Sequence, residues 1–102
     1  LKYTVADHLQ IPEEAAKLIE EKKEKEFQMA YQKGEDLYLI KGYGRQMSGG
    51  YSIQVTDLSA SVNAVFFETK LIGPTEEVQG GEPSYPYIVV KTEYRDVPVQ
   101  FQ

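Results

Sequence analysis

The glycine-rich stretch between residues 42 and 50 is the first part of the sequence to test for chemistry, because glycine loops cradle phosphates in nucleotide-binding proteins. Glycine occupies positions 42, 44, 49 and 50. A dinucleotide-binding fingerprint needs a third glycine where Met47 stands, and a phosphate loop needs lysine where Gly50 stands. Both motifs also need a helix after the loop to hold the anion, whereas the alternating residues that follow predict a strand. The stretch therefore does not predict a phosphate site.

Acid–base and metal chemistry require residue types that this sequence supplies sparingly. His8 is the only histidine and there is no cysteine, so a closed zinc site lacks ligands and a serine triad would depend on that one base. For His8 we expect a capping or surface role. The acidic residues Glu76, Glu77 and Glu82 could hold calcium weakly, but their spacing matches no calcium loop. We expect no enzyme activity, no cofactor and no metal site.

One enzymatic alternative stays open on the sequence. Asp57, Glu68 and Glu93 are titratable residues on expected strands, and a concave pocket that brought them together could support acid–base catalysis. The sequence by itself does not show such a pocket.

The glycine stretch is suited to a different task, the display of side chains to a partner protein. Glycine permits positive φ and close backbone approach, which we expect at Gly49 and Gly50. We predict a protein-binding site formed by Arg45, Gln46, Met47, Ser48, Gly49, Gly50 and Tyr51, because arginine, methionine and tyrosine are enriched in interfaces. The alternative is a hairpin connection with a bulge that serves folding only. Tyr85 and Tyr87 either add aromatic area nearby or belong to the core.

The composition is typical of one folded domain. The 102 residues suffice for one core, and 41% of them are hydrophobic and 26% charged. The 16 acidic residues outnumber the 11 basic ones, and the net charge of −5 argues against nucleic acid as a partner. No apolar run is long enough to span a bilayer. Because the sequence begins at Leu1, we expect a mature or trimmed fragment with any export signal upstream.

Residue periodicity predicts one helix followed by strands. The helix is expected over residues 11–26, with Pro12 at its first position and Ala15, Leu18 and Ile19 on its buried side. Alternating patterns predict a hairpin over residues 27–32 and 37–44, a second hairpin over 51–57 and 63–72, a strand over 85–94 and a short last strand over 97–101. Residues 73–84 are expected to form a long surface loop.

These elements predict an α+β fold that is mostly β. One N-terminal helix is expected to pack on a small antiparallel β-sheet curled into a barrel or sandwich of about six strands. Apolar residues on both faces of the strand over residues 37–44 predict a central position with cover on both sides. A single domain is expected to span residues 1–102.

Three blocks of the sequence, in order, resemble the C-terminal domain of the protease-complex subunit PrcB family. They are YLIKGYGRQMSGGYSIQV, VFFETKLIGP and YPYIVVK, and the resemblance covers roughly residues 7 to 92. The family signature is a glycine, a few polar residues, a serine or threonine and then Gly-Gly-Tyr. It falls here on Gly44, Ser48, Gly49, Gly50 and Tyr51, and the later blocks match at Pro74, Tyr85, Pro86 and Tyr87.

The resemblance implies a non-catalytic subunit that supports the assembly or stability of an exported protease complex. It also implies a bacterial source, an extracytoplasmic or cell-envelope location, and a protein partner for which a protease is the leading candidate. The Gly-Tyr loop is similar as well to the loop that chagasin-like inhibitors insert into cysteine proteases. The alternative function is therefore a protease inhibitor that presents Gly49, Gly50 and Tyr51.

Overall fold

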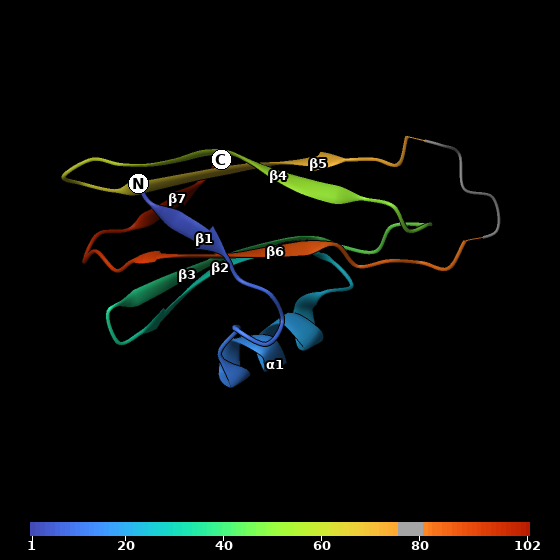
Figure 1. Ribbon diagram of the computed structural model, residues 1–102, viewed down its shortest axis with the longest axis horizontal. Coiled ribbons are helices and arrows are strands. Elements are labelled where there is room, and N and C mark those ends of the chain that lie inside the picture. The colour runs from blue at the N-terminus through green and yellow to red at the C-terminus, as the bar shows by residue number, and fades with distance from the viewer. Residues whose placement is uncertain (76–80) are drawn as a thin grey trace.

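A computed structural model describes residues 1–75 and 81–102 of the chain. Its elements are β1 (Tyr3–Val5), α1 (Glu13–Lys22), β2 (Glu26–Lys33), β3 (Asp36–Tyr43), β4 (Ser52–Ala60), β5 (Val65–Ile72), β6 (Tyr87–Glu93) and β7 (Val99–Phe101). Strands β1, β6, β3 and β2 form sheet 1 in that order, and β4, β5 and β7 form sheet 2. The two sheets lie face to face and α1 covers the other face of sheet 1 (Figure 1). The predicted helix-on-sheet fold is confirmed, as an open sandwich and not a closed barrel.

The two predicted hairpins are confirmed. β2 and β3 pair in register from Glu26↔Tyr43 to Lys33↔Asp36, around a turn in which Gly34 has a φ of +61°. β4 and β5 pair from Ser52↔Ile72 to Ala60↔Val65. A β-bulge interrupts the β4–β5 pairing between Val55 and Asp57, which locally bends the strand.

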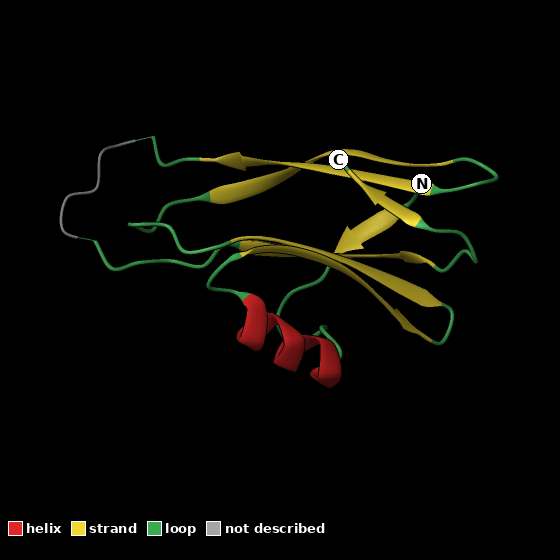
Figure 2. Cartoon of the chain, turned by 180° about the vertical axis from the view of Figure 1, so that it is seen from behind, coloured by secondary structure: helices red, strands yellow, loops and turns green. Residues whose placement is uncertain are grey.

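Strand β3 is central, as its two apolar faces predicted. Leu37 and Leu39 belong to the core between the sheets, whereas Tyr38 and Ile40 belong to a second core under the helix. The core between the sheets consists of Leu37, Leu39, Leu58, Val65, Phe67, Ile88 and Val90. The core under the helix consists of Ala6, Ala15, Ile19, Tyr38, Ile40 and Val89. The molecule thus has three layers, with sheet 1 in the middle (Figure 2).

Helix α1 differs from the prediction at both of its ends. Pro12 is the N-cap residue, with a ψ of 140° that is not helical, so the helix begins one residue later than expected. It ends at Lys22, because β2 already begins at Glu26. The Glu14 carboxylate accepts a hydrogen bond from the Tyr31 hydroxyl at 3.0 Å, which ties α1 to β2 and raises the pKa of Tyr31. No helix in residues 1–75 and 81–102 combines the length and apolar character needed to cross a bilayer.

The termini add two short strands that change the topology from the one expected. β1, which the sequence does not signal, pairs antiparallel with β6. All three of its residues are exposed, so it carries no burial pattern. β7 pairs parallel to β5, because the chain crosses from β6 in sheet 1 back to sheet 2. The expectation of a wholly antiparallel sheet is therefore wrong for this pair.

Two connections cross between the sheets at the same end of the sandwich (Figures 1 and 2). Residues 44–51 lead from β3 in sheet 1 to β4 in sheet 2, and residues 73–86 lead from β5 back to β6. We call these segments the first and second crossovers. The interpretation of residues 44–51 as a hairpin connection is wrong, because β3 and β4 lie in different sheets.

Candidate functional site

The predicted binding residues lie on the first crossover, which is paired with the second. The Tyr43 N–H donates to the Pro86 carbonyl at 3.0 Å, which prolongs the β3–β6 pairing. Gln46 and Ser84 then form an isolated antiparallel bridge, with N···O distances of 2.8 and 3.0 Å. Between these two contacts, the chain that follows β3 has two residues, 44 and 45, whereas the chain that precedes β6 has only residue 85. This extra residue makes the connection a β-bulge. The pairing fixes residues 43–46 against residues 84–86 at the end of the second crossover.

Gly44 occupies this bulge with a φ of +74°. L-residues rarely adopt that conformation. A Cβ on Gly44 would also lie 2.9 Å from the Glu26 amide nitrogen, closer than real Cβ contacts come. The next residue, Arg45, donates its N–H to the Glu24 carbonyl at 3.1 Å. The bulge therefore packs against the turn between α1 and β2, and position 44 in the bulge requires glycine.

Gln46 and Ser48 hold the crossover in place and are only half exposed. The Gln46 side-chain amide donates to the Tyr43 carbonyl at 3.0 Å. The Ser84 hydroxyl donates to the Ser48 carbonyl at 2.6 Å, and the Ser48 hydroxyl donates to the Gly49 carbonyl at 3.3 Å. These two predicted site residues thus serve mainly to shape the backbone.

The two adjacent glycines have different roles. Gly50 has a φ of +86°, and a Cβ there would lie 3.0 Å from the Pro74 Cβ. Gly49 has no positive φ and no atom within 4 Å of a built Cβ, so the expectation of a glycine requirement holds for Gly50 alone. Tyr51 is half-buried, and its Cε1 lies 3.7 Å from a Cβ built on Gly73. The tyrosine ring therefore lies along the start of the second crossover.

Gly50→Ala is expected to lower the free energy of unfolding by about 1–2 kcal/mol, because alanine in the left-handed region is strained. Gly49→Ala is the matched control, expected to change stability by no more than about 0.5 kcal/mol. Urea denaturation followed by circular dichroism measures both values. Equal losses for the two variants would contradict the assignment of the left-handed conformation to Gly50.

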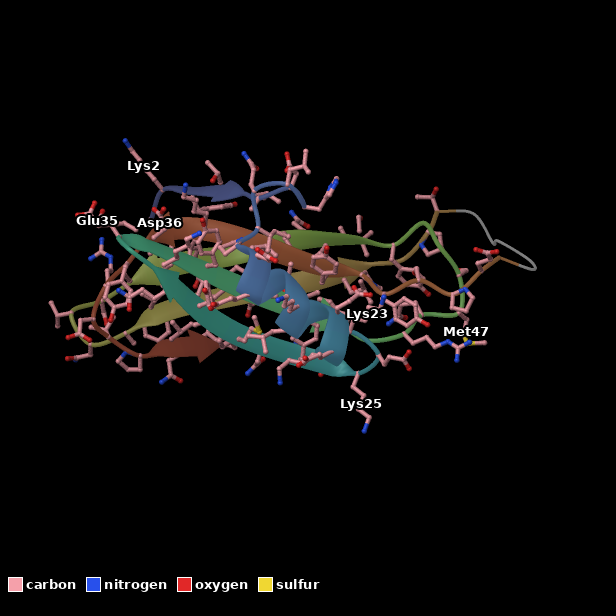
Figure 3. The ribbon with its side chains drawn as sticks, turned by 90° about the horizontal axis from the view of Figure 1, so that it is seen from below. Lys2, Lys23, Lys25, Glu35, Asp36 and Met47 are labelled. Atoms are coloured by element: carbon pink, nitrogen blue, oxygen red, sulfur yellow. The ribbon has the colours of Figure 1, made fainter. Side chains whose placement is uncertain are left out.

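The side chains that the crossover displays to solvent are Arg45 and Met47. Both are exposed, and Met47 is 78% exposed. Figure 3 places Met47 at the crossover end, opposite the end that carries Lys2, Glu35 and Asp36.

Tyr85 lies on the second crossover and Tyr87 at the start of β6, and both lie outside the buried core. Tyr85 is half-buried, and the Lys23 ammonium lies 5.1 Å from its ring centroid in a cation–π contact. The Glu20 carboxylate bonded to Lys23 raises the pKa of that ammonium group. Tyr87 is 38% exposed at the start of β6. Neither tyrosine is part of the buried core.

Sequence reasoning missed one residue on which the site depends and the structural role of a second. Ser84 bonds both Gln46 and Ser48, but a lone serine in a polar loop carries no signal. Gly44 was noted in the glycine-rich stretch and in the family signature, but its place in a bulge was not predicted, although a glycine within a strand pattern can indicate one. The site is therefore a pair of crossovers and not one loop.

Two of the three candidate acid–base residues lie opposite each other, and the third lies in the other sheet. Asp57 and Glu68 pair across β4 and β5 in sheet 2, and they accept hydrogen bonds from Ser59 at 3.1 Å and Thr56 at 2.8 Å. Glu93 lies in sheet 1 on β6.

The acidic residues considered as calcium ligands do not form a metal-binding cluster within residues 1–75 and 81–102. Glu82 is exposed, while Glu76 and Glu77 lie outside the residues that the structure describes. Residues 1–75 and 81–102 contain no group of three or more metal-ligating side chains. His8 is exposed in the turn before α1, as expected for a surface residue.

Comparison with known proteins gives one match. The family model described as PrcB C-terminal matches residues 37–93, which is more than half of the chain. The match runs from β3 to the end of β6, so it contains both crossovers. It does not extend over α1, which the resemblance in the sequence had included. No curated protein and no solved structure matches the chain.

Proposed function

Because the chain belongs to the PrcB C-terminal family, we propose that it is a non-catalytic protein-binding module of an exported bacterial protease complex. It supports the assembly or stability of that complex outside the cytoplasm or in the cell envelope. Its partner is a protein, with a protease as the first candidate, and the contact surface is formed by residues 45–51. The single observation that carries the proposal is the pairing of the crossovers, which holds Arg45 and Met47 in solvent on a fixed backbone.

The fixed backbone supports a binding role on energetic grounds. Association is opposed by the entropy lost when flexible segments become ordered, so a segment that is already held binds at lower cost. Backbone bonds from Arg45 to Glu24 and between Gln46 and Ser84 hold the first crossover before any partner arrives. Arginine, methionine and tyrosine, which are enriched in interfaces, all lie on this surface.

Replacing Arg45 by Glu and Met47 by Asp together is expected to weaken partner binding at least about tenfold, because the two exposed contact side chains are lost. The assay immobilises the domain, captures proteases from an envelope fraction of the source organism, and measures the affinity of the identified protease for each variant. Neither substitution alters a buried residue, so the doubly substituted domain should remain folded.

Arg95→Glu with Val62→Asp is the matched control, since it also replaces an arginine by glutamate and an exposed apolar residue by aspartate, near the other end of the sandwich. Binding that survives the Arg45 and Met47 changes would exclude this surface as the contact. If the domain were instead an inhibitor that presents Gly49, Gly50 and Tyr51, it would block peptide hydrolysis by the captured protease. The rate of hydrolysis by that protease can be measured with and without the domain. An accessory subunit leaves that activity intact or raises it.

A further inference from the structure

Only two side chains of this protein contain sulfur, and their surroundings differ. The sequence has two methionines, Met29 and Met47, and no cysteine. Met29 lies on β2, where it is half-buried and packs against the core under the helix. Met47 lies on the first crossover and is 78% exposed. A reagent in solution that attacks sulfur therefore reaches Met47 far more easily than Met29.

The backbone on both sides of Met47 is bonded to Ser84, which keeps the methionine outside the core. The Gln46 N–H donates to the Ser84 carbonyl at 2.8 Å, and the Ser84 N–H donates to the Gln46 carbonyl at 3.0 Å. The Ser84 hydroxyl donates to the Ser48 carbonyl at 2.6 Å. These bonds would have to break before the backbone could carry Met47 into the interior. The thioether is thus held in solvent by its neighbours along the chain.

Peroxides oxidise an accessible thioether by transferring oxygen to it. Hydrogen peroxide gives one oxygen atom to the methionine sulfur, its O–O bond breaks, and its other oxygen leaves as water. The sulfur loses two electrons and becomes a sulfoxide, so an apolar side chain turns polar. The reaction is reversed by a methionine sulfoxide reductase with two thiols, which are joined in a disulfide while the oxygen leaves as water.

A sulfoxide at position 47 would change the surface that the proposed function assigns to the partner. In that contact the thioether contributes apolar area, which favours binding. The S=O group is instead a hydrogen-bond acceptor, and burying it without a donor opposes binding. An interface formed around the apolar thioether supplies no such donor.

We infer that Met47 is a site of selective oxidation by peroxides, and that formation of its sulfoxide releases the partner protein. The inference rests on the proposed function, because it takes Met47 as part of the contact with that partner. Met29 does not share this role, since its side chain packs under the helix.

Oxidation of the purified domain tests the selectivity. The domain is treated with hydrogen peroxide for increasing times, and the two methionine peptides are followed by mass spectrometry. The Met47 sulfoxide should form at least about tenfold faster than the Met29 sulfoxide, because exposure governs the rate. Equal rates at the two positions would overturn the inference. Urea denaturation should give the same free energy of unfolding before and after oxidation of Met47 alone.

The affinity for the captured protease tests the release. The domain is oxidised until Met47 alone has reacted, the peroxide is removed, and untreated protease is added. Binding should be at least about tenfold weaker than with the untreated domain. Methionine sulfoxide reductases for both sulfoxide epimers, supplied with a dithiol, should restore the affinity. A loss that the reductases do not reverse would come from other damage and would contradict the inference.

Met47→Leu and Met29→Leu form a matched pair of variants, because leucine keeps an apolar side chain and cannot form a sulfoxide. Each variant is compared with itself before and after peroxide, so any effect of the substitution on binding cancels. The Met47→Leu domain should bind the protease equally in both states. The Met29→Leu domain should lose affinity as the unaltered domain does. Peroxide sensitivity that persists in the Met47→Leu domain would exclude Met47 as the responsible site.

The outcomes separate this inference from the proposed function. Unchanged binding after oxidation of Met47 would overturn the inference and leave the proposed function standing. Bound protease should also slow the oxidation of Met47, and a protease that binds without slowing it would overturn both the inference and the assignment of the contact surface. The absence of any captured protein partner would overturn both proposals.

Discussion

Phe67→Ala is expected to lower the free energy of unfolding by about 3–5 kcal/mol, because truncation of a buried phenylalanine leaves a cavity that its neighbours fill only in part. The Phe67 side chain is 1% exposed in the core between the sheets. Its ring also packs edge to face on Phe101, with 6.0 Å between the centroids. The variant thus weakens the contact between β5 and β7 as well as the main core. Urea denaturation measures the loss.

Phe66→Ala provides the control, since it makes the same truncation one residue away. Phe66 is half-buried, and its side chain faces away from the core on the outer side of β5. Its loss should cost about 1 kcal/mol. Similar losses for the two variants would mean that the sheets do not enclose the face of β5 that carries Phe67.

Gly44→Ala is expected to cost about 2–4 kcal/mol, the second largest effect. The left-handed conformation contributes about 1–2 kcal/mol of this loss, and the contact of the new Cβ with the Glu26 amide nitrogen contributes the remainder. Backbone atoms form that contact, so a side-chain rotation cannot relieve it. Denaturation measures the loss, and capture of the partner by the variant should weaken in parallel because the first crossover shifts.

Gly34→Ala separates the two causes. Gly34 has a φ of +61° in the β2–β3 turn, but no atom lies within 4 Å of a Cβ built there. Its substitution should therefore cost only the conformational part, about 1–2 kcal/mol. A loss at position 44 no larger than the loss at position 34 would contradict the tight seating of the bulge against the α1–β2 turn.

The sequence predicted the elements whose signals are local. Alternation along β2 and β3 around Gly34 predicted the first hairpin, and helical spacing of Ala15 and Ile19 predicted the buried side of α1. The two apolar faces of β3 predicted its central position. Each of these patterns reflects burial within a single element, so it can be recognised without knowledge of the partner elements.

Features that depend on distant segments were not predictable in the same way. The crossing of residues 44–51 between sheets depends on which strands pair, and strand pairing leaves no mark in the intervening residues. The role of Ser84 depends on its bridge to Gln46 across two strands. β1 consists of exposed residues, so its pairing with β6 produces no pattern. The exposure of Arg45 and Met47 followed the prediction, whereas the anchoring roles of Gln46 and Ser48 came from the structure.

The order of strands in sheet 1 has a consequence for how the chain acquires its structure. β6 lies between β1 and β3, yet the chain makes the whole β4–β5 hairpin before it reaches β6. Sheet 1 therefore stays divided during synthesis until nearly the entire domain has emerged from the ribosome. Contacts between segments so far apart along the chain slow folding. The nascent domain is consequently expected to expose unpaired strands for longer than a fold built from sequential hairpins.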